Sequence, residues 1–351
     1  MIRRLPLLAL LVLTLAGCGS DEEGAGETTT GDTTAATTGQ SGGAPLRIGL
    51  VTDIGGLDDR SFNFLANKGL EQAQDELGVE GRVVISRSNA DYVPNLSRLA
   101  QQDYDLVIAI GFLMAEAVET VANRFPEVAF AIVDSSQEAS KTKPKNLRGL
   151  LFKEQEAGYL VGYLAGLVTA EQAGAKQRIG SVGGLKIPPV DRYIAGYQAG
   201  AKAANPELET VNAYSQDFVD QAKCKELALD QIANGAYVVF QVAGQCGLGA
   251  LSAAQEKNVL GIGVDADQGY LGDHILTSAL KKVDVAVFQT IQAVEEGTFN
   301  GGEDVVFDVA SGAVGIGEIS PDAPAGAVAE VKRIQDEIAS GQIADIPETV
   351  G

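Results

Sequence analysis

From residue 46 onward, short apolar runs alternate with longer segments in which apolar residues recur at helical spacing. Four apolar runs are predicted to be buried strands, at residues 46–51, 82–86, 106–110 and 128–133. The segments that follow the first three are predicted to be helices, at residues 62–77, 96–101 and 114–124. Strands that are apolar throughout and separated by helices indicate a parallel sheet covered on both faces.

A second series of the same kind follows farther along the chain. Its predicted strands lie at residues 178–182, 210–214, 237–242 and 259–264, and its helices at residues 190–204, 220–233 and 249–256. Residues 276–284 are predicted to be a strand that crosses back to the first series. Two such series predict an α/β protein with two similar lobes. Because ligands of open α/β sheets bind beyond the carboxyl ends of the strands, we expect a site in the cleft between the lobes.

One apolar stretch also has the pattern of a membrane helix, because Gly158, Gly162 and Gly166 recur every four residues within it. Glu154 and Glu171 bracket only about fourteen apolar or small residues, fewer than the ~20 that a membrane span needs. We interpret the stretch as a buried helix whose glycines allow close approach to a sheet.

The first residues have the pattern of an export signal. Arg3 and Arg4 precede an apolar run at residues 5–15, which is too short to span about 30 Å of hydrocarbon. The run ends in Leu-Ala-Gly-Cys, which resembles a bacterial lipobox, so residues 1–17 are predicted to be a lipoprotein signal peptide and Cys18 to be lipidated. The alternative is a secretory signal in which this cysteine is incidental. We expect the protein on the outer face of the cell membrane, attached through lipid only.

A tether is expected to follow the lipidated cysteine. After Cys18, residues 19–44 contain many glycines and threonines and neither aromatic nor basic residues. Such a segment cannot offset its ordering entropy by burial, so residues 18–45 are predicted to be a disordered tether.

Composition excludes several classes of function. The 351 residues include 26 Lys and Arg against 47 Asp and Glu, a formal net charge of −21, which argues against a nucleic-acid partner. A single histidine, His274, excludes a multi-His metal site, and three cysteines without a Cys-x-x-Cys motif exclude a zinc ribbon or thioredoxin-like pair. We expect no metal and no cofactor.

Polar and aromatic residues gather where the predicted strands end. Asp53 leaves the first strand and precedes a glycine turn and a helix that opens with Phe62 and Asn63. Asp265 ends the last strand of the second series, where a carboxylate can accept hydrogen bonds from neighbouring sugar hydroxyls. Lys281 lies on the crossing strand and can donate where the lobes meet. The alternative role for each carboxylate is to cap a turn or helix. The glycines of residues 244–249 lack dinucleotide-fingerprint spacing.

Six motifs occur in the order and spacing of a known family. They are Val-Thr-Asp at 51–53 with Asp-Asp-Arg-Ser-Phe-Asn at 58–63, Phe-Lys-Glu at 152–154 with Gly-Tyr-Leu at 158–160, Val-Gly-Gly at 182–184, Val-Ala-Gly at 242–244, Gly-Val-Asp-Ala-Asp-Gln at 263–268, and Thr-Ser at 277–278 with Lys281. They resemble the basic membrane protein family, bacterial lipoproteins that bind purine nucleosides for ABC transporters.

The resemblance extends from about residue 47 to residue 318. It implies a periplasmic-binding-protein type I fold, in which two doubly wound parallel-sheet lobes are joined by a three-stranded hinge, and it implies no enzymatic activity. Lobe 1 is expected at 46–153, completed by part of 275–351, and lobe 2 at 154–274. Residues 275–351 would hold the returning hinge strand and the C-terminal segment.

The resemblance also implies ligand contacts in lobe 1. Asp53 and Asn63 would hydrogen-bond the ligand, and Phe62 would stack on its base. At a position after the third strand where the family often has aspartate, this chain has Glu116, whose extra methylene moves the carboxylate. Stacking on an aromatic ring tolerates different bases.

In lobe 2, Phe218 would supply the opposing aromatic face, and Gly244 would let the backbone approach the ligand. Asp265 and Lys281 would hold the ribose hydroxyls. By this resemblance, the protein would be a nucleoside receptor that delivers its ligand to a permease. The alternatives are a simple-sugar receptor of the same fold, a sensor that feeds no transporter, and a nucleoside hydrolase or phosphorylase. Only paired acids such as Asp58-Asp59 suggest the enzyme, without an activated nucleophile or metal cluster.

Cys224 and Cys246 are predicted to form a disulfide. They are the only thiols left once Cys18 carries lipid, and an exported protein meets an oxidising environment. Cys224 lies early in the predicted helix at 220–233 and Cys246 in the glycine loop after the next strand, two places that a right-handed crossover brings to one sheet edge. The alternative is two buried cysteines that do not touch.

Overall fold

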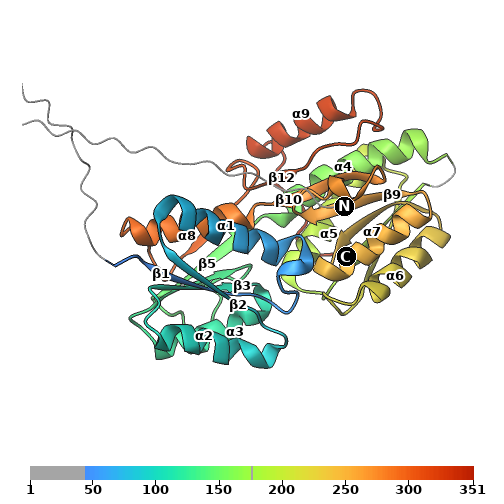
Figure 1. The fold of residues 1–351 in the computed structure, drawn as a ribbon. Helices are drawn as coiled ribbons and strands as arrows, with labels where there is room; N and C mark the ends of the chain where they lie inside the picture. The colour runs from blue at the N-terminus through green and yellow to red at the C-terminus, as the bar shows by residue number, and fades with distance from the viewer. Residues whose placement is uncertain (1–43, 175–176) are drawn as a thin grey trace, which may run out of the picture. The chain divides into compact units, whose positions relative to one another are not determined.

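Two six-stranded sheets organise the part of the chain that the structure, a computed structural model, describes: residues 44–174 and 177–351 (Figure 1). The predicted signal peptide, Cys18 and nearly all of the predicted tether lie outside the described residues.

Lobe 1 is an all-parallel sheet in the order β11-β5-β4-β3-β1-β2. Its strands are β1 (Arg47–Val51), β2 (Glu80–Val84), β3 (Leu106–Ile110), β4 (Ala129–Val133), β5 (Leu147–Phe152) and β11 (Asp304–Phe307), and its helices are α1 (Phe62–Leu77), α2 (Tyr92–Gln101), α3 (Ala115–Arg124) and α8 (Val283–Glu295). Helices α1 and α8 pack together on one face, and α2 and α3 on the other (Figure 1). Every residue of β3 is buried because the strand is central and covered on both sides.

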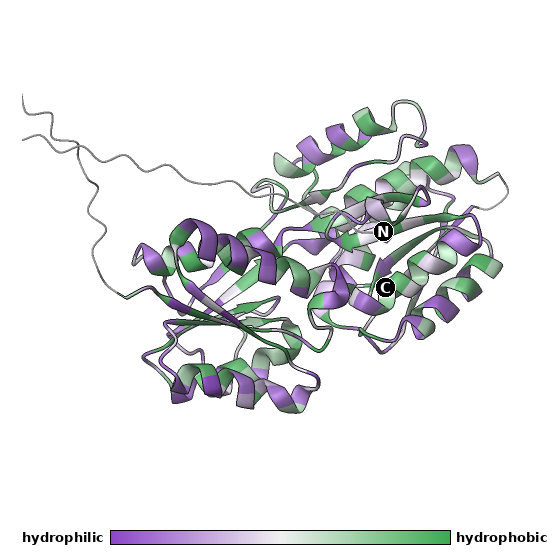
Figure 2. Cartoon of the chain, viewed as in Figure 1, coloured by the Kyte–Doolittle hydropathy of each residue, from purple (hydrophilic) through white to green (hydrophobic). Residues whose placement is uncertain are grey.

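Lobe 2 repeats this arrangement in the order β12-β10-β9-β8-β6-β7. Its strands are β6 (Arg178–Gly183), β7 (Glu209–Tyr214), β8 (Ala236–Val242), β9 (Leu260–Asp265), β10 (Ile275–Lys281) and β12 (Val314–Ile316), and its helices are α4 (Glu154–Gln172), α5 (Pro188–Ala204), α6 (Gln221–Ala233), α7 (Gly244–Glu256) and α9 (Ala327–Ala339). The short strand β12 is antiparallel to β10, an exception to the predicted parallel sheet. Hydrophobic residues concentrate in the strands and alternate with hydrophilic ones along the outer helices (Figure 2).

The chain passes between the lobes three times, from β5 to α4, from β10 to α8 and from β11 to β12. The passages lie side by side: the Lys153 amide donates to the Phe307 carbonyl at 2.9 Å, and the Lys282 amide to the Ala313 carbonyl at 2.8 Å.

The predicted boundary of lobe 2 at residue 274 is wrong, because β10 is a full member of the lobe 2 sheet. Its apolar residues are buried beside β9, and the chain leaves the lobe only after Lys281.

The glycines of α4 pack against another helix rather than against the predicted sheet. A Cβ atom at Gly158 or Gly162 would overlap the backbone carbonyl of Tyr193 or Tyr197 on α5. Gly196 of α5 approaches the backbone of α4 in the same way. The two helices therefore touch backbone to backbone, which fixes where α5 presents Tyr193. Among the described residues, no helix has the length and apolar character that crossing a membrane requires.

Candidate ligand-binding site

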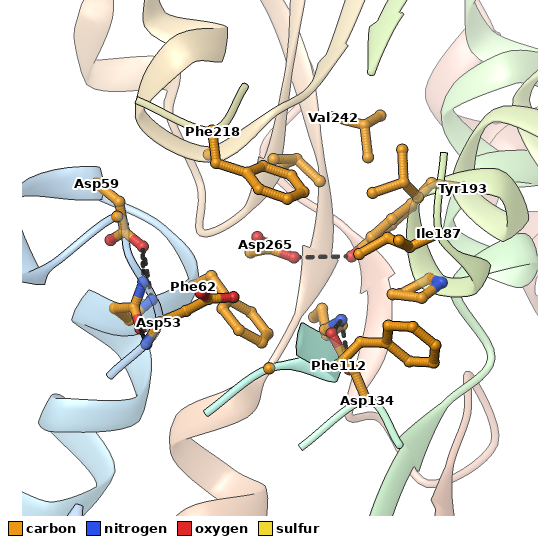
Figure 3. Close-up of a pocket in the computed structure, with 18 of the residues that line it drawn as sticks. Asp53, Asp59, Phe62, Phe112, Asp134, Ile187, Tyr193, Phe218, Val242 and Asp265 are labelled. Atoms are coloured by element: carbon orange, nitrogen blue, oxygen red, sulfur yellow. Dashed lines mark hydrogen bonds and ion pairs between the residues drawn. The ribbon is translucent and has the colours of Figure 1, made fainter. Parts of the chain in front are cut away.

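A cavity of about 650 Å³, its opening included, lies between the lobes at the carboxyl ends of their strands (Figure 3). Its lining includes Asp53 and Gly111 after β1 and β3 of lobe 1, and Val242 and Asp265 at the ends of β8 and β9 of lobe 2. Strand order reverses between β1 and β3 and between β6 and β8, the places where open α/β sheets bind ligands.

Aromatic rings from both lobes enter this cavity. Phe62, the first residue of α1, and Phe112, just after β3, come from lobe 1 (Figure 3). Tyr193 on α5 and Phe218 between β7 and α6 come from lobe 2. Phe218 lies over Gly184, where any Cβ atom would overlap its ring. A flat ligand can therefore contact aromatic faces from opposite sides.

A hydrogen-bonded cluster builds the lobe 1 wall around Asp53. Asp59 caps α1 by accepting the backbone N–H groups of Ser61, Asn63 and Phe64. Asn63 donates its amide to Asp59 at 3.0 Å and accepts the Asp53 backbone N–H at 3.0 Å. Burial raises the pKa values of the Asp53 and Asp59 carboxyls, although hydrogen bonds oppose the increase.

The Asp53 carboxylate has one oxygen engaged and one available. Oδ1 accepts the hydroxyl of Tyr92 and, at 2.6 Å, the backbone N–H of Ile54. Oδ2 accepts no hydrogen bond from the described residues, and Asp53 lines the cavity. This oxygen is therefore free to accept a hydrogen bond from a ligand.

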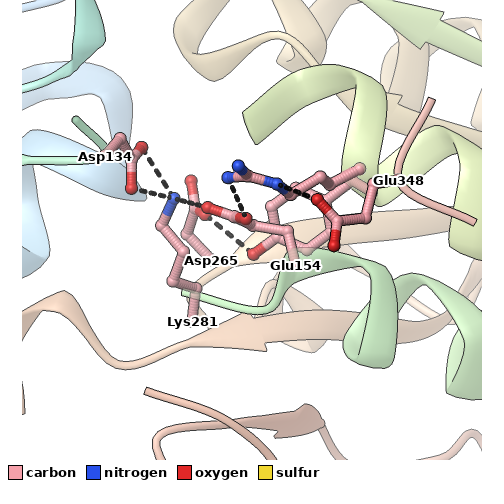
Figure 4. A network of polar contacts seen from close by, with 7 residues as sticks. Asp134, Glu154, Asp265, Lys281 and Glu348 are labelled. Carbon is pink, nitrogen blue, oxygen red and sulfur yellow. Dashed lines mark hydrogen bonds and ion pairs between the residues drawn. The ribbon is translucent and has the colours of Figure 1, made fainter. Parts of the chain in front are cut away.

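The ammonium of Lys281 is buried between the lobes in a network of carboxylates (Figure 4). Its Nζ lies 2.8 Å from both oxygens of Asp134 and 3.1 Å from Oε1 of Glu154. Glu154 also meets Arg192 at 3.4 Å, which in turn meets Glu348 near the C-terminus at 3.3 Å. Burial lowers the pKa of Lys281, but the negative charges of Asp134 and Glu154 outweigh it and raise the pKa overall. The ammonium therefore stays charged and joins β4 of lobe 1 to β10 of lobe 2.

Asp134 and Asp265 occupy equivalent places in the two lobes, at the ends of β4 and β9. Both have left-handed backbone conformations, with φ of 68° and 61°, which are uncommon for a residue with a side chain. The hydroxyl of Tyr193 donates to Asp265 at 3.1 Å. Burial raises the pKa of Asp265 to about 7, although the charge of Lys281 opposes the shift. The site therefore has one carboxyl poised to titrate near neutral pH.

The cavity combines hydrogen-bond acceptors with aromatic faces, which suits an uncharged ligand that carries hydroxyl or N–H donors. Within residues 44–174 and 177–351, no group of three or more His, Cys, Asp and Glu side chains is arranged to hold a metal ion.

A family model described as Bmp, ABC transporter substrate-binding protein PnrA-like, matches residues 47–348. The chain belongs to this PnrA-like family. Membership implies a small solute as ligand and the permease of an ABC transporter as partner, and the family consists of transporter binding proteins rather than enzymes.

Two relatives and one solved structure illustrate the similarity. An ABC transporter nucleoside-binding protein, BmpA, of Lactococcus lactis is 33% identical over 294 residues, which cover 78% of this chain and 81% of that protein. An uncharacterized lipoprotein of Pyrococcus horikoshii is 34% identical over 272 residues, which cover 74% of this chain and 66% of that protein. The crystal structure of an ABC transporter solute-binding protein of Aeropyrum pernix has a TM-score of 0.79 and 29% identity, covering 87% and 94%. This likeness confirms the predicted periplasmic-binding-protein type I fold with two parallel-sheet lobes.

Of the predicted ligand-binding residues of this PnrA-like protein, all except Glu116 line the cavity. Glu116 lies in the first turn of α3, its side chain is 85% exposed, and it pairs with Lys141 at 3.0 Å. The expected contact from Glu116 is wrong, because Gly111 and Phe112 already occupy the cavity side of the turn after β3. The Glu116 side chain points to solvent instead.

Lys281 also differs from its expected role. Its three N–H groups are matched by Asp134 and Glu154, so the described residues already satisfy the ammonium that was expected to hold ribose hydroxyls. Its position beside the cavity instead fixes the carboxylates around it.

The cavity residues that were not predicted as ligand contacts include four with polar or aromatic side chains: Asp59, Phe112, Asp134 and Tyr193. Phe112 and Asp134 lie just after β3 and β4, where the sequence marks a strand end but does not distinguish a ligand contact from the start of a helix or loop. Asp59, which the sequence suggests as one of a pair of acids, is the cap of α1. Nothing in the sequence marks Tyr193 inside its helix.

Cys224 and Cys246 form a disulfide with their Cα atoms 5.6 Å apart. The expected glycine loop around Cys246 is wrong, because α7 begins at Gly244. The bridge therefore joins the first turns of α6 and α7, which pack side by side.

Replacing Lys281 with methionine should destabilise the folded protein strongly at neutral pH. Removing one partner of a buried ion pair costs about 3–5 kcal/mol because the carboxylates of Asp134 and Glu154 lose their counter-charge. Burial already raises the pKa of Glu154, and loss of the ammonium removes the charge that opposes this increase, so the loss of stability should be smaller at pH 5 than at pH 7.5.

Urea denaturation followed by circular dichroism at both pH values measures this loss. Lys332→Met, which removes a 70% exposed lysine paired with Asp336, is the matched control and should cost no more than about 1 kcal/mol. Equal losses for the two variants at pH 7.5 would contradict the role of Lys281.

Proposed function

We propose that this protein captures a purine nucleoside in the cavity between its lobes and delivers it, chemically unchanged, to the permease of an ABC importer. The observation that carries the proposal is the pair of rings, Phe62 and Phe218, that reach the same cavity from opposite lobes. A planar base stacks on such rings with about 1–3 kcal/mol per contact. A sugar alone has no flat face of comparable size to place between them.

The carboxylates support the sugar half of the ligand. Asp265 and the free oxygen of Asp53 are acceptors within the same cavity, and nucleoside hydroxyls and base N–H groups are the donors they require. Buried acceptors left without a donor are costly, so these residues favour a ligand that matches them. The nucleoside-binding protein of Lactococcus lactis, which is 33% identical, is consistent with this ligand class.

We also propose that the protein is held at the outer face of the cell membrane by lipid on Cys18. The support is the short apolar run with Arg3 and Arg4 before it and small residues directly before the cysteine. The relative from Pyrococcus horikoshii is itself described as a lipoprotein.

Adenosine and inosine should bind far more tightly than ribose, as measured by calorimetry on the purified protein. Phe62→Ala should weaken adenosine binding by about 1–3 kcal/mol because one stacking face is lost. Phe64→Ala is the matched control, since Phe64 lies on the same helix, is 46% exposed and is not part of the cavity lining. Equal affinity for ribose and adenosine would favour the simple-sugar receptor, and release of free base from inosine would favour the hydrolase.

The affinity for adenosine should fall as the pH drops below about 7, the pKa of Asp265 in the free protein. Ligand hydroxyls donate to the ionised carboxylate, so binding lowers this pKa and requires the loss of a proton below it. The dissociation constant should rise by up to about tenfold per pH unit between pH 7 and pH 5. Asp265→Asn should bind weakly with a nearly flat profile, whereas a wild-type profile that is flat would exclude Asp265 as the acceptor.

Cys18→Ser should release the protein from membranes when it is expressed in a bacterial host that processes lipoproteins. Without the thiol no diacylglyceryl group can be attached, and its two acyl chains are the expected basis of stable retention. Detergent phase partitioning measures the change. Partitioning that is the same for the variant and the wild type would reject the anchor.

A further inference from the structure

The lobe 2 ring that faces the ligand lies in an irregular segment. Phe218 sits between β7 and α6, where residues 215–220 belong to neither helix nor strand and Val219 is 41% exposed. Local hydrogen bonds give the segment some order, because Asp217 accepts the N–H groups of Val219 and Asp220 at 2.8 and 3.0 Å. Asp217 also pairs with Lys223 at 2.7 Å. All of these contacts stay within the segment and the helix that follows it.

The start of the segment is tied to the end of β6, because the Ser215 and Gln216 amides donate to the Gly183 and Gly184 carbonyls at 2.8 and 3.1 Å. At Phe218 itself, the backbone contact comes from α7. The backbone N–H of Cys246 donates to the carbonyl of Phe218 at 3.0 Å. Two residues earlier, Gly244 lines the cavity, and a Cβ atom placed there would lie 3.5 Å from the same carbonyl. The first turn of α7 therefore forms the support on which the backbone of Phe218 rests.

The disulfide connects the first turn of α7 to α6, the helix that follows Phe218 in the chain. Cys224, in the first turn of α6, follows Phe218 by only six residues, and its bridge to Cys246 holds α6 against α7. Both cysteines are fully buried. Two contacts therefore connect the region of Phe218 to the first turn of α7. One is the hydrogen bond from the Cys246 amide to the Phe218 carbonyl, and the other is the disulfide at Cys224, six residues after Phe218.

We propose that the Cys224–Cys246 disulfide is a positioning element that keeps Phe218 at the cavity before the ligand arrives. This proposal rests on the proposed function, because it deepens the role given there to Phe218. If the ring is already in place, less of the free energy of binding is lost in ordering the loop. This preorganisation should appear as slower dissociation of the ligand. The two cysteines act through Phe218 and are not expected to touch the ligand.

A double-mutant cycle tests the coupling. Cys224→Ala/Cys246→Ala should weaken adenosine binding by about tenfold, mainly through faster dissociation. In a Phe218→Ala background, removing the disulfide should change the affinity by less than about twofold, because the ring it positions is absent. An equal loss in both backgrounds would overturn the proposal, since the bridge would then act only through general stability.

A stability control separates positioning from folding. Ile232→Ala truncates a buried side chain at the far end of α6, in the same apolar cluster as the two cysteines. It should lower the melting temperature while leaving adenosine affinity within about twofold of wild type. If Ile232→Ala weakens binding as much as loss of the disulfide does, positioning is rejected.

Hydrogen exchange on the ligand-free protein gives a readout that does not depend on any nucleoside. Loss of the disulfide should speed exchange in residues 215–222 and 244–247 and leave β6 and β9 unchanged. Unchanged exchange in residues 215–222 would overturn the proposal. Faster exchange there in a protein that binds no purine nucleoside would reject the proposed function and leave the positioning of Phe218 standing.

If the double alanine variant does not fold, wild-type protein that is unfolded, reduced with a phosphine and refolded under reducing conditions supplies the same comparison. The phosphine attacks the S–S bond and takes the oxygen of one water molecule to become a phosphine oxide, and the two protons of that water give the two thiols. The same exchange and affinity criteria apply to this reduced protein.

Discussion

A buried positive charge at the junction of the lobes is the constraint on which the rest of the site depends. Moving an ammonium out of water is expensive, and only close carboxylates can offset the cost. Lys281 meets Asp134 of lobe 1 and Glu154 at the first passage between the lobes, and its charge also lies 5.0 Å from the ring of Phe62 and 5.8 Å from that of Tyr193. The cation therefore holds together the carboxylates and rings that surround the ligand cavity.

The two lobes have the same strand order, so each contributes equivalent strand ends to the site. Each lobe places the reversal of its strand order at the cavity and ends its fourth strand of the series, β4 or β9, in an aspartate. Asp134 and Asp265 both carry left-handed backbone strain, which a fold tolerates where the side chain must point to one place. One of them neutralises Lys281, and the other is left beside the cavity with a pKa of about 7. Equivalent positions have thus taken different roles because only one faces the lysine directly.

The apolar pattern was sufficient to predict the two α/β lobes, because strands buried on both faces and helices with one apolar face leave clear periodic signals. It missed β5, where Arg148 and Gly149 interrupt the apolar run, and it placed the end of lobe 2 too early at β10. Asp53 and Asp265 could be predicted to line the cavity because they lie at strand ends, and the topology determines where the strand ends lie. Glu116 and Tyr193 could not be placed, since the direction of a helical side chain depends on how its helix packs. For Tyr193 that packing is the backbone contact between α4 and α5.

Each lobe on its own carries half of the proposed binding site. Lobe 1 supplies Phe62 and Asp53, and lobe 2 supplies Phe218 and Asp265, so a ligand that satisfies all four side chains must contact both lobes at once. The ion pairs of Lys281 likewise require contact between the lobes, because its partners come from both sides of the junction. The ammonium of Lys281 is already paired with carboxylates when no ligand is present. The acceptors at the cavity, Asp53 and Asp265, therefore remain to be matched by hydrogen-bond donors of a ligand. Because those acceptors are carboxylates, a neutral molecule rich in donors fits this site and an anion does not.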